Sequence, residues 1–148
     1  MPLEGDYEPS PSQWVRDQVE AYERSAGQRA NTLRDTGWPI VIVATRGNKS
    51  GKIRKFGLMR VEHGGEYALV ASKGGAPDHP QWYHNLKADP KALTIQDGPD
   101  AVDFEAIEVS GDLRALWWER AVAAYPPYAQ YQTKTDRLIP VLVAHRRS

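Results

Sequence analysis

The segment IVIVAT, residues 40–45, is followed by RGNKSGK, residues 46–52, and by RKFGLMRVE, residues 54–62. The first segment is nearly all apolar and rich in β-branched residues, which is typical of a buried strand. The glycines of the second segment predict a turn, and the third segment favours another strand. Two strands joined by so short a turn are expected to pair in antiparallel fashion.

Turn signals and apolar runs continue this pattern along the chain. HGGE at residues 63–66 and DGPD at residues 97–100 are typical of hairpin turns. Further strands are expected at residues 67–72, 92–96, 101–109 and 139–144. That makes about six strands, mostly antiparallel because their connections are short.

Residues at helical spacing predict three or four helices. Ser12 is expected to cap the first, at about residues 13–25, whose apolar stripe contains Trp14, Val15, Val19 and Tyr22. A second helix would be capped by Asp78 or His79, with Pro80 in its first turn, and would end near Asp89. A strongly amphipathic helix is expected at residues 112–124, and a short one through Gln132.

These elements favour an α+β protein that is mainly β. Few strand–helix–strand alternations are present, so a doubly wound parallel sheet is disfavoured. A small barrel with helices packed outside fits better. We expect an N-terminal arm and amphipathic helix over residues 1–30 and the barrel over residues 31–148.

Composition limits the function classes. The 148 residues are 41% apolar, enough for one domain with a core. The chain has no cysteine, which excludes disulfides and thiol catalysis and suits the cytoplasm. There is no apolar run long enough to span a membrane and no secretory signal at the start. The four histidines show no metal-ligand spacing, and no hydrolase motif is present.

The formal net charge is zero, but the cations are clustered. Residues 46–60 hold six cations and no acid, while the first 23 residues hold six acids and one arginine. With no acid nearby in the sequence to pair with them, these cations favour one anionic ligand, such as a phosphate or a carboxylate. The alternative is a solvated strand edge protected from aggregation by its lysines.

Two further segments have a composition suited to a flat ring and its substrate. The loop KGGAP at residues 73–77 allows unusual backbone angles and close ligand approach. Tyr125, Tyr128 and Tyr131 recur every three residues and would share one helix face. The alternatives are a tight turn with Trp82 as a core anchor, and a tyrosine stripe that faces the core.

Four blocks of the sequence carry a resemblance to a known family. They are GNKSGKIRK at residues 47–55, ASKGGAP at 71–77, PQWYHNLK at 80–87 and YPPYAQYQTKTDRLIP at 125–140. In this order they resemble the deazaflavin (coenzyme F420)-dependent nitroreductase family of actinobacteria. The resemblance implies a split β-barrel of the flavin-reductase and pyridoxamine-oxidase type.

The resemblance also implies where coenzyme F420 binds. The phospholactyl-polyglutamate tail would lie on the cationic segment, at Asn48, Lys49, Ser50, Lys52, Arg54, Lys55 and Arg60. The deazaflavin ring would be lined by Ala71, Ser72, Lys73, Gly74, Gly75, Ala76 and Trp82. Tyr125, Tyr128, Tyr131 and Ser72 would border the substrate pocket. Gly57, near the ring, stands where many relatives carry a proline.

The implied reaction is hydride transfer from reduced F420 to an electron-poor small molecule. Family substrates are quinones, coumarin and furan-lactone enones, and nitroimidazoles. A hydroxyl of Ser72, Tyr128 or Tyr131 is the expected catalytic group, hydrogen-bonded to the oxygen on which charge develops. The proton is expected to come from solvent.

Other hypotheses remain open from the sequence. One is a split-barrel oxidoreductase that binds FMN, and another is a non-catalytic cofactor-binding protein. Nucleic acid is not an expected partner, because the aromatic residues do not interleave with the cations. Weak association of the first helix with a membrane surface stays an alternative, although its polar face mixes acids with arginines. The oligomeric state is open.

Overall fold

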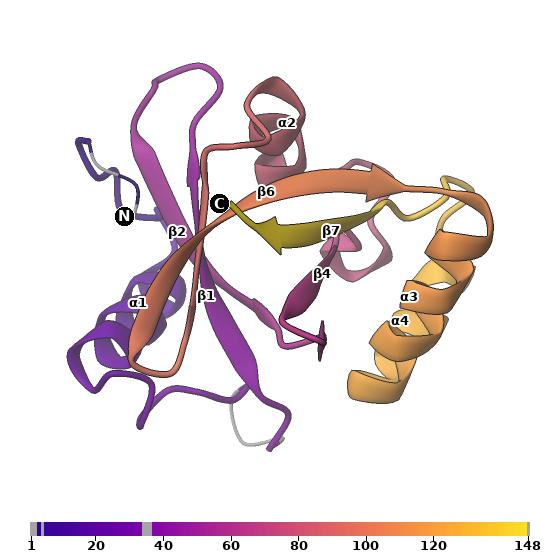
Figure 1. Cartoon of the computed structure of the whole chain (residues 1–148), viewed down its shortest axis with the longest axis horizontal. Coiled ribbons are helices and arrows are strands. Elements are labelled where there is room, and N and C mark those ends of the chain that lie inside the picture. Colours follow the sequence, from indigo (N-terminus) through magenta and orange to yellow (C-terminus); the bar gives the residue numbers. More distant parts are fainter. Residues whose placement is uncertain (1–2, 4, 34–36, 148) are drawn as a thin grey trace.

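The computed structural model describes residues 3, 5–33 and 37–147. They form a curled antiparallel sheet of seven strands in the order β2-β1-β5-β6-β7-β4-β3, flanked by helices (Figure 1). The strands are β1 Ile40–Arg46, β2 Ile53–Met59, β3 Glu62–His63, β4 Glu66–Val70, β5 Leu93–Asp97, β6 Asp100–Val109 and β7 Val141–Arg146. The helices are α1 Gln13–Arg24, the 3-10 turn η1 Lys73–Gly75, α2 Gln81–Ala88, α3 Gly111–Ala124 and α4 Pro127–Thr133.

Strand β1 is buried on both faces, as its continuous apolar run predicts. Ile40 and Ile42 pack into a core cluster with residues of α1, α3 and α4. Val41 and Val43 point the other way, into a second cluster with residues of α2, β5 and β6. The two clusters are therefore separated by the strand from which the sheet is built.

The strand predicted at residues 54–62 is interrupted, so the sheet has one strand more than expected. β2 ends at Met59, and Glu62–His63 form the short β3, which pairs with β4. At the break, Arg60 N–H donates to Pro39 O at 2.9 Å, and the side chain of Val61 is only 2% exposed. Burial of Val61 turns the chain away from β1 and towards β4.

The first helix begins as predicted, and the second does not. Ser12 Oγ accepts a hydrogen bond from Val15 N at 3.5 Å, which confirms the cap of α1. The prediction of an Asp78 or His79 cap for α2 is wrong, because the capping position is Pro80, in an extended conformation. Asp78 and His79 therefore precede the capping position and cannot provide its side chain.

The prediction that α3 is strongly amphipathic is also wrong. Trp117 and Ala121 are buried, but Leu113 and Leu116 are 50% and 43% exposed. The apolar residues of this helix are thus not confined to its buried face. A sharp separation into an apolar and a polar face does not exist.

The apolar stripe of α1 is only partly covered by protein. Val19 and Tyr22 are 2% and 1% exposed and pack in the core next to Ile40. These two residues are therefore part of the core, whereas Trp14 of the same stripe is 42% exposed. None of the helices in the described ranges is long and apolar enough to cross a membrane.

Gly75 is expected to be essential for the packing of α4. Its φ is +84°, and an added Cβ would lie 2.7 Å from Tyr131 O. Gly74 has φ +64° with open space around it, so Gly74→Ala serves as a control for the backbone conformation alone. We expect Gly74→Ala to cost about 1 kcal/mol of unfolding free energy and Gly75→Ala about 1–3 kcal/mol more. Equal losses in urea unfolding would contradict this packing.

Candidate active site

A cavity of about 370 Å³ lies between α1, β2, the loop after β4, and the α3–α4 pair. It brings together segments that are far apart in the sequence. Its lining residues are Trp14, Gln18, Leu33, Ile40, Phe56, Gly57, Leu58, Met59, Val70, Ser72, Lys73, Gly74, Pro80, Trp82, Tyr125, Tyr128 and Tyr131. The predicted ring loop and the predicted substrate tyrosines therefore face the same space.

Gly57 shapes the wall of this cavity formed by α1 and β2. An added Cβ at this position would lie 2.8 Å from Gln18 Oε1 of α1. The missing side chain thus allows α1 to approach β2 closely. Nothing in the sequence alone assigned Gln18 or Trp14 to the site, because their position depends on how α1 docks.

The three tyrosines differ in what their hydroxyls do. The hydroxyls of Tyr125 and Tyr131 lie 2.8 Å apart and share a hydrogen bond. Burial, together with this hydrogen bond, raises the pKa of Tyr125 to about 12. Tyr128 is 2% exposed, and burial raises its pKa well above the usual range. Tyr125 and Tyr128 are therefore neutral O–H groups at physiological pH.

Two hydroxyls at the cavity are uncommitted. Tyr128 Oη and Ser72 Oγ form no hydrogen bond to any residue that the structure describes. Ser72 is 7% exposed, at the start of η1. Both groups can therefore donate to a bound molecule without first losing a protein partner.

The loop that carries Ser72 is held from behind by Arg137. The guanidinium donates to Ser72 O at 2.7 Å, Ala76 O at 2.9 Å and Ala71 O at 3.1 Å. It also contacts His79 Nδ1 at 2.9 Å. Burial and the nearby Arg137 charge lower the pKa of His79, in keeping with a neutral ring that accepts this hydrogen bond.

Three of the predicted ring residues lie outside the cavity lining. Ala71 is fully buried, and Gly75 packs against the backbone of α4. Ala76 contributes its carbonyl to Arg137. These positions support the loop, whereas Ser72, Lys73, Gly74 and Trp82 face the cavity.

A second cavity, of about 210 Å³, adjoins the first. It is lined by Ser10, Val15, Arg54, Lys55, Phe56, Gln81, Trp82 and Asn85. Phe56 and Trp82 line both cavities and stack with ring centroids 5.7 Å apart. Arg54 and Lys55 therefore lie on the far side of this aromatic pair from the tyrosines.

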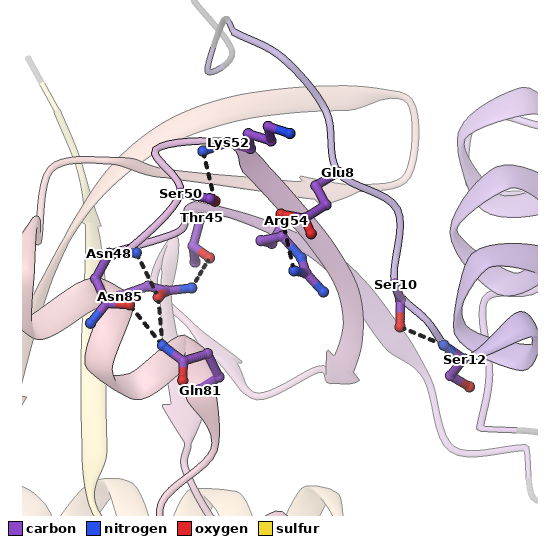
Figure 2. A network of polar contacts seen from close by, with 10 residues as sticks. All are labelled: Glu8, Ser10, Ser12, Thr45, Asn48, Ser50, Lys52, Arg54, Gln81 and Asn85. Atoms are coloured by element: carbon purple, nitrogen blue, oxygen red, sulfur yellow. Dashed lines mark hydrogen bonds and ion pairs between the residues drawn. The ribbon is translucent and has the colours of Figure 1, made fainter.

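Asn85 attaches the basic turn at residues 46–52 to α2 (Figure 2). This residue is 2% exposed. Asn85 Oδ1 accepts from Asn48 N at 3.0 Å and from Gln81 Nε2 at 3.2 Å. Its Nδ2 donates to Thr45 Oγ1 at 3.2 Å, and Ser50 Oγ accepts from Lys52 N at 3.1 Å. Asn85 and Arg137 both fall inside the sequence blocks that carry the family resemblance. Their roles require long-range contacts that spacing cannot show.

The expectation that the cations lack acidic partners is wrong for three of them. Arg54 Nη1 lies 3.4 Å from Glu8 Oε1, and Lys55 Nζ lies 2.6 Å from Glu23 Oε2. Arg60 is at the opposite end of β2, where its Nε lies 2.8 Å from Asp97 Oδ2. Arg60 is thus separated from the other cations. Within the described residues, exposed Lys49 and Lys52 form no ion pair.

The residues that the structure describes contain no group of three or more His, Cys, Asp or Glu side chains that could hold a metal ion.

Comparisons with known proteins identify the family. A model of the F420H(2)-dependent quinone reductase family matches residues 14–146. An F420H(2)-dependent quinone reductase of Mycobacterium tuberculosis is 38% identical over 112 residues, which are 74% of this chain and 74% of the relative. A solved F420-H2 dependent reductase (FDR-A) is 57% identical, with a TM-score of 0.68, and covers 72% of this chain and 94% of its own. A further solved chain, described as a domain-swapped dimer, is 51% identical, with a TM-score of 0.71, and covers 92% of this chain and 100% of its own.

The curled sheet is a split β-barrel, and the protein is an oxidoreductase of the deazaflavin-dependent class. The chain belongs to the F420H(2)-dependent quinone reductase family. The family resemblance seen in the sequence is therefore confirmed. Membership also decides between the two coenzymes left open above, in favour of reduced F420.

Proposed function

We propose that this chain reduces quinones with hydride from reduced coenzyme F420. The observation that carries the proposal is the pair of adjoining cavities, one apolar and bordered by tyrosines, the other bordered by Arg54 and Lys55. Relatives named as quinone reductases support the choice of acceptor. Enones and nitroimidazoles are the alternative acceptors.

The residues present fit the coenzyme. A flat ring suits the apolar cavity beside Gly74, where no side chain occupies the loop. Ser72, Lys73 and Trp82 would border the ring. Lys49, Ser50, Arg54 and Lys55 would bind the phosphate and carboxylates of the tail, with Asn48 and Lys52 on the same turn. We do not assign Arg60 to the tail, because it pairs with Asp97 at the other end of β2.

In this proposal residues 31–148 build the coenzyme-binding barrel and residues 1–30 add one wall, through Trp14 and Gln18. When bound, the reduced coenzyme supplies a hydride to the acceptor. The cavity walls orient the acceptor and exclude water. Ser72 Oγ and Tyr128 Oη donate hydrogen bonds to the quinone oxygen on which negative charge develops. A proton from solvent then completes the hydroquinone.

The direct test mixes the protein with reduced F420 and a panel of quinones, coumarin-type enones and nitroimidazoles. Oxidation of the coenzyme is followed by absorbance. We expect turnover with quinones to exceed turnover with the other two classes. Turnover only with enones or nitro compounds would show that quinones are not the acceptor. The absence of turnover with all three classes would contradict the proposed function.

Replacement of Tyr128 tests the hydroxyl assignment. Tyr128→Phe keeps the ring and removes the donor, and we expect kcat for quinones to fall about 100-fold. Tyr22→Phe is the matched control, since Tyr22 is also buried but its hydroxyl accepts from Gly98 N away from the cavity. An unchanged kcat in Tyr128→Phe would exclude Tyr128 as the donor.

The Lys49→Gln/Arg54→Gln double variant tests tail binding. We expect coenzyme affinity to fall by about 2 kcal/mol, roughly 30-fold in Kd, at low ionic strength. The difference from the wild type should shrink as salt is added, because salt screens the attraction in the wild type. Fluorescence titration measures Kd, and Arg120→Gln/Lys91→Gln removes equal charge outside the basic segment. Equal Kd values in both double variants would contradict the assignment.

Residues 5–10 of the N-terminal arm lie where the tail is proposed to bind. Ile53 N–H donates to Asp6 O at 2.7 Å, and Glu8 N–H donates to Ile53 O at 2.9 Å. The Glu8 carboxylate then lies beside Arg54, and Tyr7 lies under Lys55 Nζ, 5.0 Å from the ring centroid. An acidic, extended segment of this chain is thus paired with cations that the acidic tail would need.

Glu8→Gln should therefore strengthen coenzyme binding. The Arg54–Glu8 pair is partly exposed, so its loss is expected to lower Kd only about 2–5-fold at low salt. A deazaflavin without phosphate and glutamates should bind the variant and the wild type equally. Glu20→Gln is the control, because Glu20 pairs with Arg24 on α1. An unchanged or higher Kd for F420 in Glu8→Gln would show that the arm does not compete with the tail.

A further inference from the structure

We propose that Arg137 is a positioning residue for hydride transfer, an inference that rests on the proposed function. Arg137 does not line the active-site cavity. It determines instead how the loop of residues 72–76 and helix α4 face each other across that cavity. Neither the predicted site nor the family resemblance assigned it a role.

The guanidinium makes contacts with four groups behind the loop. Three are the carbonyls of Ala71, Ser72 and Ala76, and the fourth is His79 Nδ1. A planar fork of five N–H donors can hold such a set in one geometry, which a lysine cannot do. Because a peptide unit is planar and trans, the N–H groups of Ser72 and Lys73 point away from Arg137. The contacts therefore fix the orientation of both peptide groups next to the cavity.

The loop needs this support because its backbone is in an unfavourable conformation. Lys73, Gly74 and Gly75 have φ values of +47°, +64° and +84°. A lysine in the left-handed region is strained and persists only when its surroundings over-determine it. The bonds from Arg137 on either side of these three residues, at Ser72 O and Ala76 O, provide that constraint.

Arg137 also links the loop to the tyrosine wall. Gln132 at the end of α4 donates from Nε2 to Arg137 O at 2.8 Å, and its Oε1 accepts from Ile139 N at 3.0 Å. Gly75 of the loop packs against Tyr131 of the same helix. The distance between Ser72 on one wall and Tyr128 on the other is therefore set through the segment that carries Arg137.

The charge of Arg137 is only partly balanced by a neighbour. No carboxylate of the described residues lies within ion-pair distance of its guanidinium. Burial lowers the pKa of Arg137, and the charge of the nearby Asp78 carboxylate partly offsets this effect. A cation behind the loop favours negative charge that develops in front of it. The two contributions of Arg137 can be separated by substitution. Arg137→Lys keeps the positive charge but loses the planar set of donors, whereas Arg137→Gln loses both.

The test compares Arg137→Lys and Arg137→Gln in the full-length protein with Arg114→Lys. Arg114 is the matched control, because its pKa is also lowered by burial and it donates to a backbone carbonyl, but that carbonyl is Ile139 O, at 2.7 Å, and not one of the loop at residues 71–76. Thermal unfolding measures the structural cost of each variant. Single-turnover kinetics measure hydride transfer, and the absorbance band of bound oxidised F420 reports the ring environment.

We expect Arg137→Lys to unfold close to Arg114→Lys but to transfer hydride at least 10-fold more slowly, with a shifted absorbance band. Arg137→Gln should be slower still. Hydride transfer and absorbance in Arg137→Lys within 2-fold of Arg114→Lys would overturn the inference. An inactive wild-type protein would contradict the proposed function itself. Failure of the proposed function and failure of the Arg137 inference can therefore be told apart.

A second variant keeps the inference testable if Arg137→Lys does not fold. His79→Ala removes one partner of the guanidinium and leaves the arginine in place. Hydride transfer is expected to slow about 3-fold, and amide hydrogen exchange in residues 72–76 is expected to accelerate. If His79→Ala keeps the wild-type rates of hydride transfer and of amide hydrogen exchange, a positioning role for Arg137 is also contradicted.

Discussion

The burial of β1 on both faces is the constraint on which the rest of the structure depends. A strand with two apolar faces must be covered twice, so the chain builds two core clusters, one with α1, α3 and α4 and one with α2. β2 and β5 pair with its two edges. The candidate active-site cavity lies at the margin of the first cluster, where Ile40, Tyr125 and Tyr128 are shared between the core and the lining. The packing of these core residues therefore also determines the shape of the cavity.

Much of the fold could be predicted from local patterns, because burial and turn chemistry act over a few residues. The register of β1 and β2 follows from the turn between them, and Ser12 capped α1 as expected. The errors came from tertiary contacts. Burial of Val61 divided the second strand, and the docking of α3 left Leu113 and Leu116 exposed.

Part of the lining of the candidate cavity was predictable where motifs lie in short blocks. Ser72, Trp82 and the three tyrosines were singled out from sequence, and they share one cavity. Asn85 and Arg137 were missed because each acts through backbone groups distant in sequence. The prediction that the cations of the basic segment lack acidic partners failed for the same reason, because it considered only residues nearby in the sequence. The acids that pair with Arg54 and Lys55 come from Glu8 and Glu23, which only the fold brings near.

The arm beside β2 has a practical consequence for recombinant protein. Residues fused ahead of the arm would extend a segment that already pairs with Ile53 at the edge of the sheet. If the coenzyme tail binds at Arg54 as proposed, a charged purification tag at that end would change the measured coenzyme affinity. Kinetic constants from differently tagged preparations would then differ, and the tag-free chain is the proper reference.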